Sequence, residues 1–147
     1  MEWIAQLQGQ VVGLDTAPLI YFIEANPTYL EITEAFFEAF TCAEFKVVTS
    51  VVTLLEALVY PLRQGDTLLA QQYRDVLLNG ENLKSCQVPE EIAEAAAQLR
   101  TVYNLKTPDA IQLATAICEG ASFFLTNDAR LTSLPGLTVL VLDALRA

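Results

Sequence analysis

The stretch Val11-Val-Gly-Leu-Asp-Thr-Ala-Pro-Leu-Ile-Tyr-Phe22 places one carboxylate, Asp15, between two apolar runs. The residues before Asp15 predict a short buried strand from Gln10 to Leu14, and those after it predict a helix from Ala17 to Ala25. Pro18 suits the first turn of that helix, where the backbone amides have no partner within the helix. Asp15 is therefore expected at a strand-to-helix junction, where an acid either caps the helix or belongs to a ligand site.

Short strands and helices alternate along the rest of the chain. Further strands are expected at residues 46–49, 83–88, 123–126 and 138–142. The expected helices begin at a capping box of Thr28 and Glu31, at Ser50, at Asp66 or Thr67, at Glu90 and at Thr107, with a short one inside 127–134. The last four long ones run to about Gln64, Asn79, Tyr103 and Gly120. This order favours an α/β fold with a mainly parallel sheet.

Length and composition agree with one compact unit. The chain has 147 residues, of which 53% are hydrophobic, so residues 1–147 are expected to form a single domain with its own core. No apolar run approaches the ~20 residues of a membrane-spanning helix, and no signal peptide is recognisable at the start. We therefore expect a soluble protein of the cytoplasm without a membrane partner. Its three scattered cysteines, Cys42, Cys86 and Cys118, are expected to be small core residues.

The missing residue types restrict the chemistry. The chain contains no histidine, which removes the commonest general base, the Ser-His-Asp arrangement and nearly every catalytic zinc site. Catalysis would have to use carboxylates. The net charge is −10 and only eight residues are Lys or Arg, so binding of a nucleic acid would need help from a cation or a partner.

Four acids fall at or near the carboxyl ends of expected strands, where α/β proteins bind ligands. They are Asp15, Glu56, Asp109 and Asp128. Taken singly, the three aspartates are also explained as a helix cap, a first-turn acid that favours the helix dipole, and a turn residue. Glu56 lies inside an apolar stretch and needs a partner if it is buried.

A cluster of these four carboxylates would need a counter-charge. Two like charges about 4 Å apart repel by ~4 kcal/mol at an effective dielectric constant near 20. A divalent cation relieves this repulsion, and a set of oxygen ligands favours Mg²⁺ or Mn²⁺. Such ions commonly bind phosphate oxygens as well, so the expected chemistry is hydrolysis of a phosphate ester.

Four motifs in order resemble those of PIN-domain nucleases, and in particular the VapC-type toxins of bacterial toxin-antitoxin pairs. The motifs are Leu14-Asp15-Thr16 followed by Leu-Ile-Tyr-Phe, Thr49-Ser50-Val-Val-Thr53-Leu-Leu-Glu56, Thr107-Pro-Asp109-Ala-Ile-Gln-Leu-Ala-Thr-Ala116, and Leu125-Thr126-Asn127-Asp128. The resemblance implies a three-layer α/β/α sandwich around a sheet of four to five strands. It also implies an endoribonuclease that depends on Mg²⁺ or Mn²⁺, often works as a homodimer, and is inhibited by a small antitoxin protein.

The resemblance also implies roles for individual residues. Asp15 and Asp109 would be the main metal ligands, whereas Glu56 and Asp128 would support the metal, position water or bind a second ion. Thr126 would donate a hydrogen bond to this cluster. Weaker expectations are that Thr16 and Arg130 contact phosphate. The chain departs from the family at Gln112, three residues after the third acid, where the family often has His or another residue.

Three alternatives stay open at this stage. A phosphatase resembling the haloacid dehalogenases also has Asp after its first strand, but it needs a second acid two residues later, where this chain has Ala17. A catalytically silent PIN-like protein-binding module would not need all four acids. A PIN-like RNA-processing nuclease that is not a toxin would be distinguished by the absence of a short antitoxin reading frame beside this one.

Overall fold

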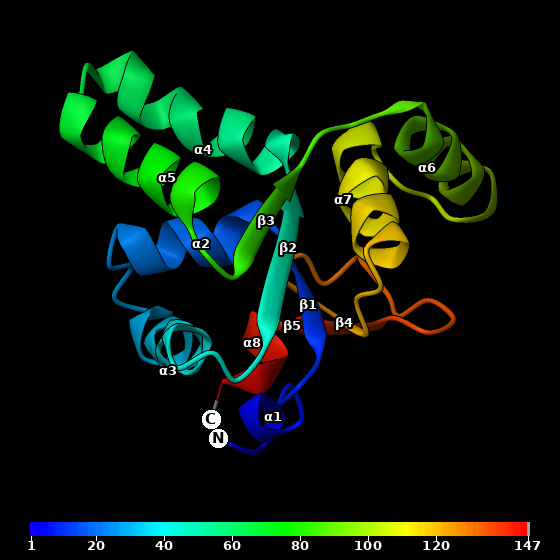
Figure 1. Ribbon diagram of the computed structural model, residues 1–147, viewed down its shortest axis with the longest axis horizontal. Coiled ribbons are helices and arrows are strands. Elements are labelled where there is room, and N and C mark those ends of the chain that lie inside the picture. The colour runs from blue at the N-terminus through cyan, green and yellow to red at the C-terminus, as the bar shows by residue number, and fades with distance from the viewer. Residues whose placement is uncertain (147) are drawn as a thin grey trace.

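Five parallel strands form the central sheet of the computed structural model, which describes residues 1–146. In space the strands follow the order β3-β2-β1-β4-β5 (Figure 1). Their bounds are Val11–Leu14 for β1, Lys46–Ser50 for β2, Leu83–Cys86 for β3, Phe123–Thr126 for β4 and Thr138–Val141 for β5. All neighbouring pairs are parallel. This confirms the predicted α/β class and places β1 at the centre.

Helices cover both faces of the sheet and complete a three-layer arrangement (Figure 1). The helices are α1 Glu2–Ala5, α2 Thr16–Ile23, α3 Leu30–Thr41, α4 Val51–Gln64, α5 Thr67–Asn79, α6 Glu90–Val102, α7 Thr107–Cys118 and α8 Leu142–Leu145. Helices α1 to α5 and α8 contribute to one apolar core, into which Val12 and Leu14 of β1 project. Helix α7 packs with Val48 and Phe124 on the opposite face, and α6 packs on α7.

Gly13 allows α7 to approach the central strand closely. A Cβ atom at this position would lie 2.7 Å from Ala116 Cβ and 2.7 Å from Phe124 Cδ1, much nearer than an ordinary carbon contact. Because α7 precedes β4 and runs antiparallel to the strands, its first turn lies at the carboxyl edge of the sheet. The missing side chain of Gly13 therefore helps to bring Asp109 to that edge.

The structure corrects two local predictions. Helix α3 begins at Leu30, and its N-cap residue is Tyr29, whose side chain forms no capping hydrogen bond. Thr28 is therefore not a capping residue. Instead the Thr28 amide donates to Asn26 Oδ1 in a turn that follows α2. Residues 127–134 form turns and contain no helix, because a short link between two paired strands has to place buried leucines at 131, 134 and 137.

The cysteine prediction was wrong for two of the three residues. Cys42 and Cys118 are exposed at the ends of α3 and α7, and Cys86 is only partly buried at the end of β3. Cys42 and Cys118 lie beyond Ala39 and Ala116, the last buried residues of their helices, and therefore face solvent. Among residues 1–146, no helix combines the length and the apolar character required to cross a membrane.

Candidate active site

Asp15 lies at the end of β1, and hydrogen bonds fix both of its carboxylate oxygens. It is the N-cap residue of α2, and its Oδ1 accepts from the Thr16 amide at 2.9 Å. Its Oδ2 accepts from the hydroxyl of Thr126 at 2.7 Å. Thr126 ends β4, the strand that pairs with β1, so parallel pairing places this hydroxyl beside Asp15. The carboxylate is thus oriented by two adjacent strand ends.

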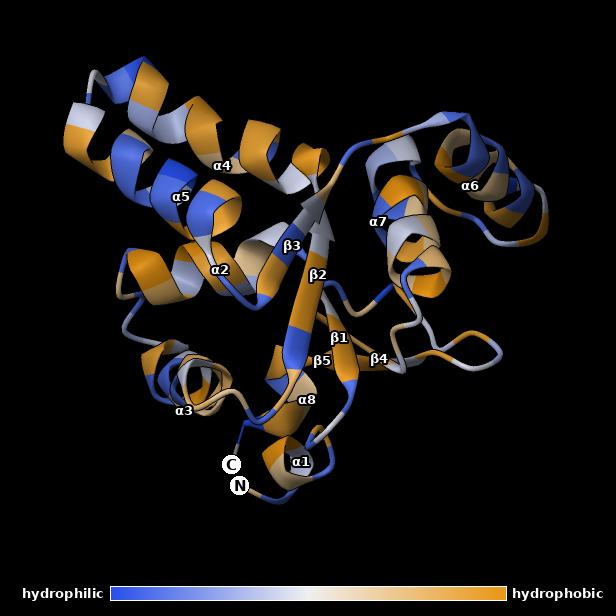
Figure 2. Ribbon diagram, viewed as in Figure 1, coloured by the Kyte–Doolittle hydropathy of each residue, from blue (hydrophilic) through white to orange (hydrophobic). Residues whose placement is uncertain are grey.

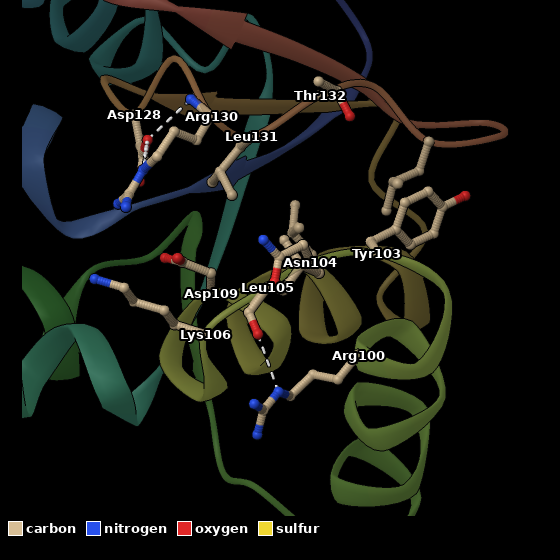
Figure 3. Close-up of a pocket in the computed structure, with 12 residues that line it drawn as sticks. Arg100, Tyr103, Asn104, Leu105, Lys106, Asp109, Asp128, Arg130, Leu131 and Thr132 are labelled. Carbon is tan, nitrogen blue, oxygen red and sulfur yellow. Dashed lines mark hydrogen bonds and ion pairs between the residues drawn. The ribbon is translucent and has the colours of Figure 1, made fainter.

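Thr126 also positions the next acid along the chain. Its Oγ1 accepts from the backbone amide of Asp128 at 3.0 Å. The Asp128 carboxylate forms two parallel hydrogen bonds with Arg130, at 2.9 Å to Nε and 2.7 Å to Nη2 (Figure 3). This guanidinium holds the pKa of the Asp128 carboxyl below its usual range. Asp128 therefore remains ionised and fixed beside Asp15.

Asp109 lies in the first turn of α7 and shares its surroundings with the other aspartates. Burial raises its pKa, and the charges of Asp15 and Asp128 raise it further, whereas Arg130 and Lys106 act in the opposite direction. Lys106 and Asp109 lie on the same side of the α6–α7 connection (Figure 3). Asp109 and Asp128 line the same pocket, so α7 and the β4–β5 loop bring their acids to one site.

The pKa of Asp15 is raised as well. Burial is the main cause, and the hydrogen bonds from Thr126 and Thr16 oppose it only in part. The charges of Glu56 and Asp128 add to the increase. The structure thus places Asp15 within electrostatic reach of the other three acids, as the positions of the strands predict.

Glu56 is the most exposed of the four acids, and a hydroxyl group holds it. Its Oε1 accepts from Thr16 Oγ1 at 2.7 Å, which joins α4 to the start of α2. Thr16, expected as a phosphate contact, is instead only 7% exposed and directs its hydroxyl to Glu56. Because Glu56 is exposed, it needs no buried cation as a partner.

A buried polar network lies directly behind Thr16. Thr53 Oγ1 lies 3.2 Å from Thr16 Oγ1 and 2.8 Å from Thr49 Oγ1. It also accepts from Gln112 Nε2 at 2.6 Å, and Gln112 Oε1 accepts from Ser50 Oγ at 3.0 Å. Gln112 is 2% exposed, so its amide connects α7 to β2 and α4 inside the protein. The sequence signal for this network was the group of hydroxyls within the apolar stretch at residues 49–53, and the spacing alone could not identify their partner on α7.

The four acids therefore meet at one edge of the sheet, although they do not form a closed cage. Within residues 1–146, no three His, Cys, Asp or Glu side chains stand in position to hold a single metal ion together. A pocket of about 480 Å³ adjoins the acids, with Asp109 and Asp128 among its lining residues (Figure 3). The arrangement can supply one or two carboxylates to a cation. The other ligands of that cation would be water and an oxygen atom of a molecule bound in the pocket.

The fold and the site together define a class of protein: an α/β domain with a parallel sheet and a cluster of acids at the carboxyl end of its central strand. A family model described as PIN domain matches residues 12–137, and the chain belongs to the PIN-domain family. Comparison with curated protein sequences gave no significant match.

Solved structures from toxin-antitoxin systems have the same fold. VapBC2 from Rickettsia felis, bound to a DNA fragment from its promoter, matches with a TM-score of 0.68 and 18% identity over 89% of this chain and 98% of that one. A toxin-antitoxin complex from Klebsiella pneumoniae matches with a TM-score of 0.66 and 24% identity, over 87% and 95% of the two chains. VapC20 from Mycobacterium tuberculosis, a sarcin-ricin loop cleaving toxin, matches with a TM-score of 0.63 and 14% identity, over 78% and 86%.

Proposed function

We propose that residues 1–147 form one nuclease domain, an endoribonuclease dependent on Mg²⁺ or Mn²⁺ that acts in the cytoplasm as the toxin of a toxin-antitoxin pair. The observation that carries this proposal is the gathering of Asp15, Glu56, Asp109 and Asp128 from four separate segments at one edge of the sheet. Membership of the PIN-domain family and the likeness to VapC20, a sarcin-ricin loop cleaving toxin, support it.

The donor set fits a hard divalent cation. Asp15 and Asp109 would hold the ion, since burial and neighbouring negative charge raise the pKa of both and a cation would offset this charge. Mg²⁺ typically takes only one or two carboxylates and keeps several waters, so it does not require three protein ligands in contact. When bound, such an ion supplies a Lewis acid for a phosphate oxygen and an acidified water for attack on phosphorus.

The chain's own residues would orient the reactants. Thr126 and the Thr16 amide hold the carboxylate of Asp15 in one orientation, and each of its oxygens keeps acceptor capacity for a further ligand. Glu56, held by the Thr16 hydroxyl, would orient the attacking water or accept its proton. Asp128 would support the site from the β4 side, with Arg130 offsetting its charge.

An exposed apolar surface on α4 supports the proposed protein partners. Four large apolar side chains of this helix are 42–65% exposed: Leu55, Val59, Tyr60 and Leu62. Figure 2 shows the hydrophobic colouring along α4, beside the more polar α5. A surface of this kind commonly marks a protein interface. We propose that a second copy of the chain or the antitoxin covers it, and structures of toxin-antitoxin complexes are among those with the same fold.

The decisive test is cleavage of structured RNAs by the purified chain in Mg²⁺ or Mn²⁺, with and without a chelator. We expect cleavage that the chelator abolishes and that falls to background in Asp15→Asn and Asp109→Asn. Glu31→Gln on α3 is the matched control, since it also removes one negative charge but lies on an exposed helix surface outside the acid cluster. Full activity in chelator, or in both Asn variants, would contradict the proposal.

The toxin role requires a separate observation. We expect a short reading frame for a small protein directly beside this gene, and we expect that protein to bind the chain and suppress cleavage. RNA cleavage without such a neighbour would favour an RNA-processing nuclease, and complex formation without any cleavage would favour a silent binding module.

A further inference from the structure

The pocket beside Asp109 and Asp128 has two different walls. One wall is the connection between α6 and α7, and the other is the loop between β4 and β5 (Figure 3). Its volume of about 480 Å³ falls in the range of ~300–1,000 Å³ that is common for ligand sites. Because both acids belong to the lining, a ligand in this pocket would directly adjoin the proposed reaction site.

Positive charge is concentrated around this pocket. The chain has only eight Lys and Arg residues at a net charge of −10, and three of the eight line this one pocket: Arg100, Lys106 and Arg130. Arg100 is used structurally, since its guanidinium donates to the Leu105 carbonyl at 3.0 Å and to Thr107 Oγ1 at 2.9 Å. It thereby shapes the wall, and Lys106 and Arg130 provide the charge.

Both of these cations keep donors for a ligand. Within residues 1–146, Lys106 takes part in no ion pair, and its side chain extends past Asp109 on the side of the pocket away from Tyr103 (Figure 3). Arg130 uses Nε and Nη2 for Asp128, which leaves further N–H donors of the guanidinium free. Its side chain is 70% exposed, so a phosphate can reach it from solvent.

The interior of the pocket suits a flat, partly apolar group. Its apolar lining consists of the partly buried Leu105 and Tyr103 and of the edges of the buried leucines 113, 131 and 134, and Tyr103 lies at the end of the pocket away from Asp128 (Figure 3). Asn104 and Thr132 are exposed polar residues on opposite walls. Together they offer amide and hydroxyl groups to the edge of a ring that rests on apolar side chains, which is how proteins commonly read an unstacked base.

We propose that this pocket binds the unpaired nucleotide adjacent to the scissile phosphate of a single-stranded RNA segment. Lys106 and Arg130 contact its backbone phosphates, and Asn104 contacts the edge of its base. The proposal rests on the endoribonuclease function proposed above and adds residues that select the site of cleavage. A base enters such a pocket only when it is released from stacking and pairing, so loops and single strands are the substrates that fit.

The test separates binding from cleavage by using an Asp15→Asn background. Fluorescence anisotropy with a labelled, unstructured RNA 12-mer in Mg²⁺ measures affinity as a function of salt. We expect Lys106→Gln to lower the slope of log K against log salt by about 0.7, the amount for one phosphate contact to a single strand. Lys46→Gln, which removes an exposed lysine at the other edge of the sheet, should leave the slope unchanged.

Base contact is tested with labelled oligo(A), oligo(C) and oligo(U) of equal length. Asn104→Ala should change the relative affinities for these three RNAs by about two- to tenfold, as expected for one hydrogen bond. In the chain with Asp15 intact, it should also shift the positions of cleavage in a long RNA.

The outcomes distinguish the two proposals. Equal salt slopes for Lys106→Gln and Lys46→Gln, unchanged base preference in Asn104→Ala, or no measurable RNA binding by the Asp15→Asn parent would overturn the pocket assignment even if the chain cleaves RNA. Binding that depends on Lys106 and Asn104 without any cleavage by the unmodified chain would instead overturn the nuclease and leave a nucleotide-binding pocket.

Discussion

Replacement of Gly13 by alanine tests whether the close packing of α7 on β1 is structurally required. The new Cβ would lie 2.7 Å from both Ala116 Cβ and Phe124 Cδ1, whereas carbon atoms in contact are normally about 3.5–4.0 Å apart. Ala116 and Phe124 are each 1% exposed, so neither can move aside into solvent. The strand and the helix would have to separate by about 1 Å.

Overpacking of this kind usually lowers the free energy of unfolding by ~1–3 kcal/mol, and two simultaneous contacts place Gly13→Ala at about 3 kcal/mol. For a chain of this length, each kcal/mol lowers Tm by roughly 2–4 °C, so we expect a fall of about 6–12 °C in thermal unfolding. The RNA cleavage proposed above should fall as well, because Asp109 moves with α7.

Ala116→Gly provides the matching test. Alone it should lower stability by about 1 kcal/mol, the usual effect of glycine inside a helix. Combined with Gly13→Ala it removes one of the two close contacts, so the double variant should be more stable than the sum of the single effects by at least about 0.5 kcal/mol. Ala97→Gly on the exposed side of α6 is the control and should combine additively. A Gly13→Ala protein within about 0.5 kcal/mol of the original, or additivity with Ala116→Gly, would refute the packing argument.

Three further predictions concern the site and its surroundings. Because burial raises the pKa of Asp15, the folded protein holds this proton more tightly than the unfolded chain, and stability is lost as pH rises through the raised pKa. In chelator at neutral pH, Asp15→Asn should therefore have a higher Tm than the original chain, and Mg²⁺ should raise Tm only in the original; equal Tm values would contradict this. Gln112→Leu removes hydrogen bonds to Ser50 and Thr53 and should lower the free energy of unfolding by about 1–3 kcal/mol in urea, whereas an unchanged midpoint would argue against a buried network. Burial raises the pKa of the Cys86 thiol to about 11, so at pH 8 it should react with iodoacetamide roughly 100-fold more slowly than an unperturbed thiol, and equal labelling of all three cysteines by mass spectrometry would contradict this.

Much of the fold is predictable because short apolar runs are separated by strong stop signals. The strand at Phe123–Thr126 has the predicted bounds, since Gly120 ends the helix before it and Asn127 begins a turn after it. The predicted N-cap at Ser50 is confirmed, because its Oγ accepts from the Val52 amide at 3.1 Å. Local chemistry determines both features.

The errors arise where two local signals compete or where tertiary packing decides. The Thr28 and Glu31 pattern matches a capping box, but Asn26 takes the Thr28 amide and delays the helix to Leu30. A short helix is predicted inside 127–134, but the parallel pairing of β4 and β5 leaves only a link of turns between them. In each case a contact outside the motif determines the conformation.

The candidate site is predictable to a similar degree. Parallel strands bring their carboxyl ends together, so the gathering of Asp15 with the other acids follows from the order of strands and helices. Their roles as metal ligands stay a prediction. The pocket and the contacts of Gln112 cannot be predicted this way, because they depend on how α7 packs on its neighbours and not on any spacing within the chain.

The central position of β1 has a consequence for the order in which the protein becomes active. This strand is synthesised well before β4, yet it pairs with β4, and Thr126 at the end of β4 holds the carboxylate of Asp15. A chain that has not yet released β4 from the ribosome therefore lacks both the strand and the hydroxyl that orient its first acid, and also lacks Asp128. The nuclease activity proposed above therefore requires β4 to emerge and pair, and termination anywhere before β4 should yield fragments without that activity.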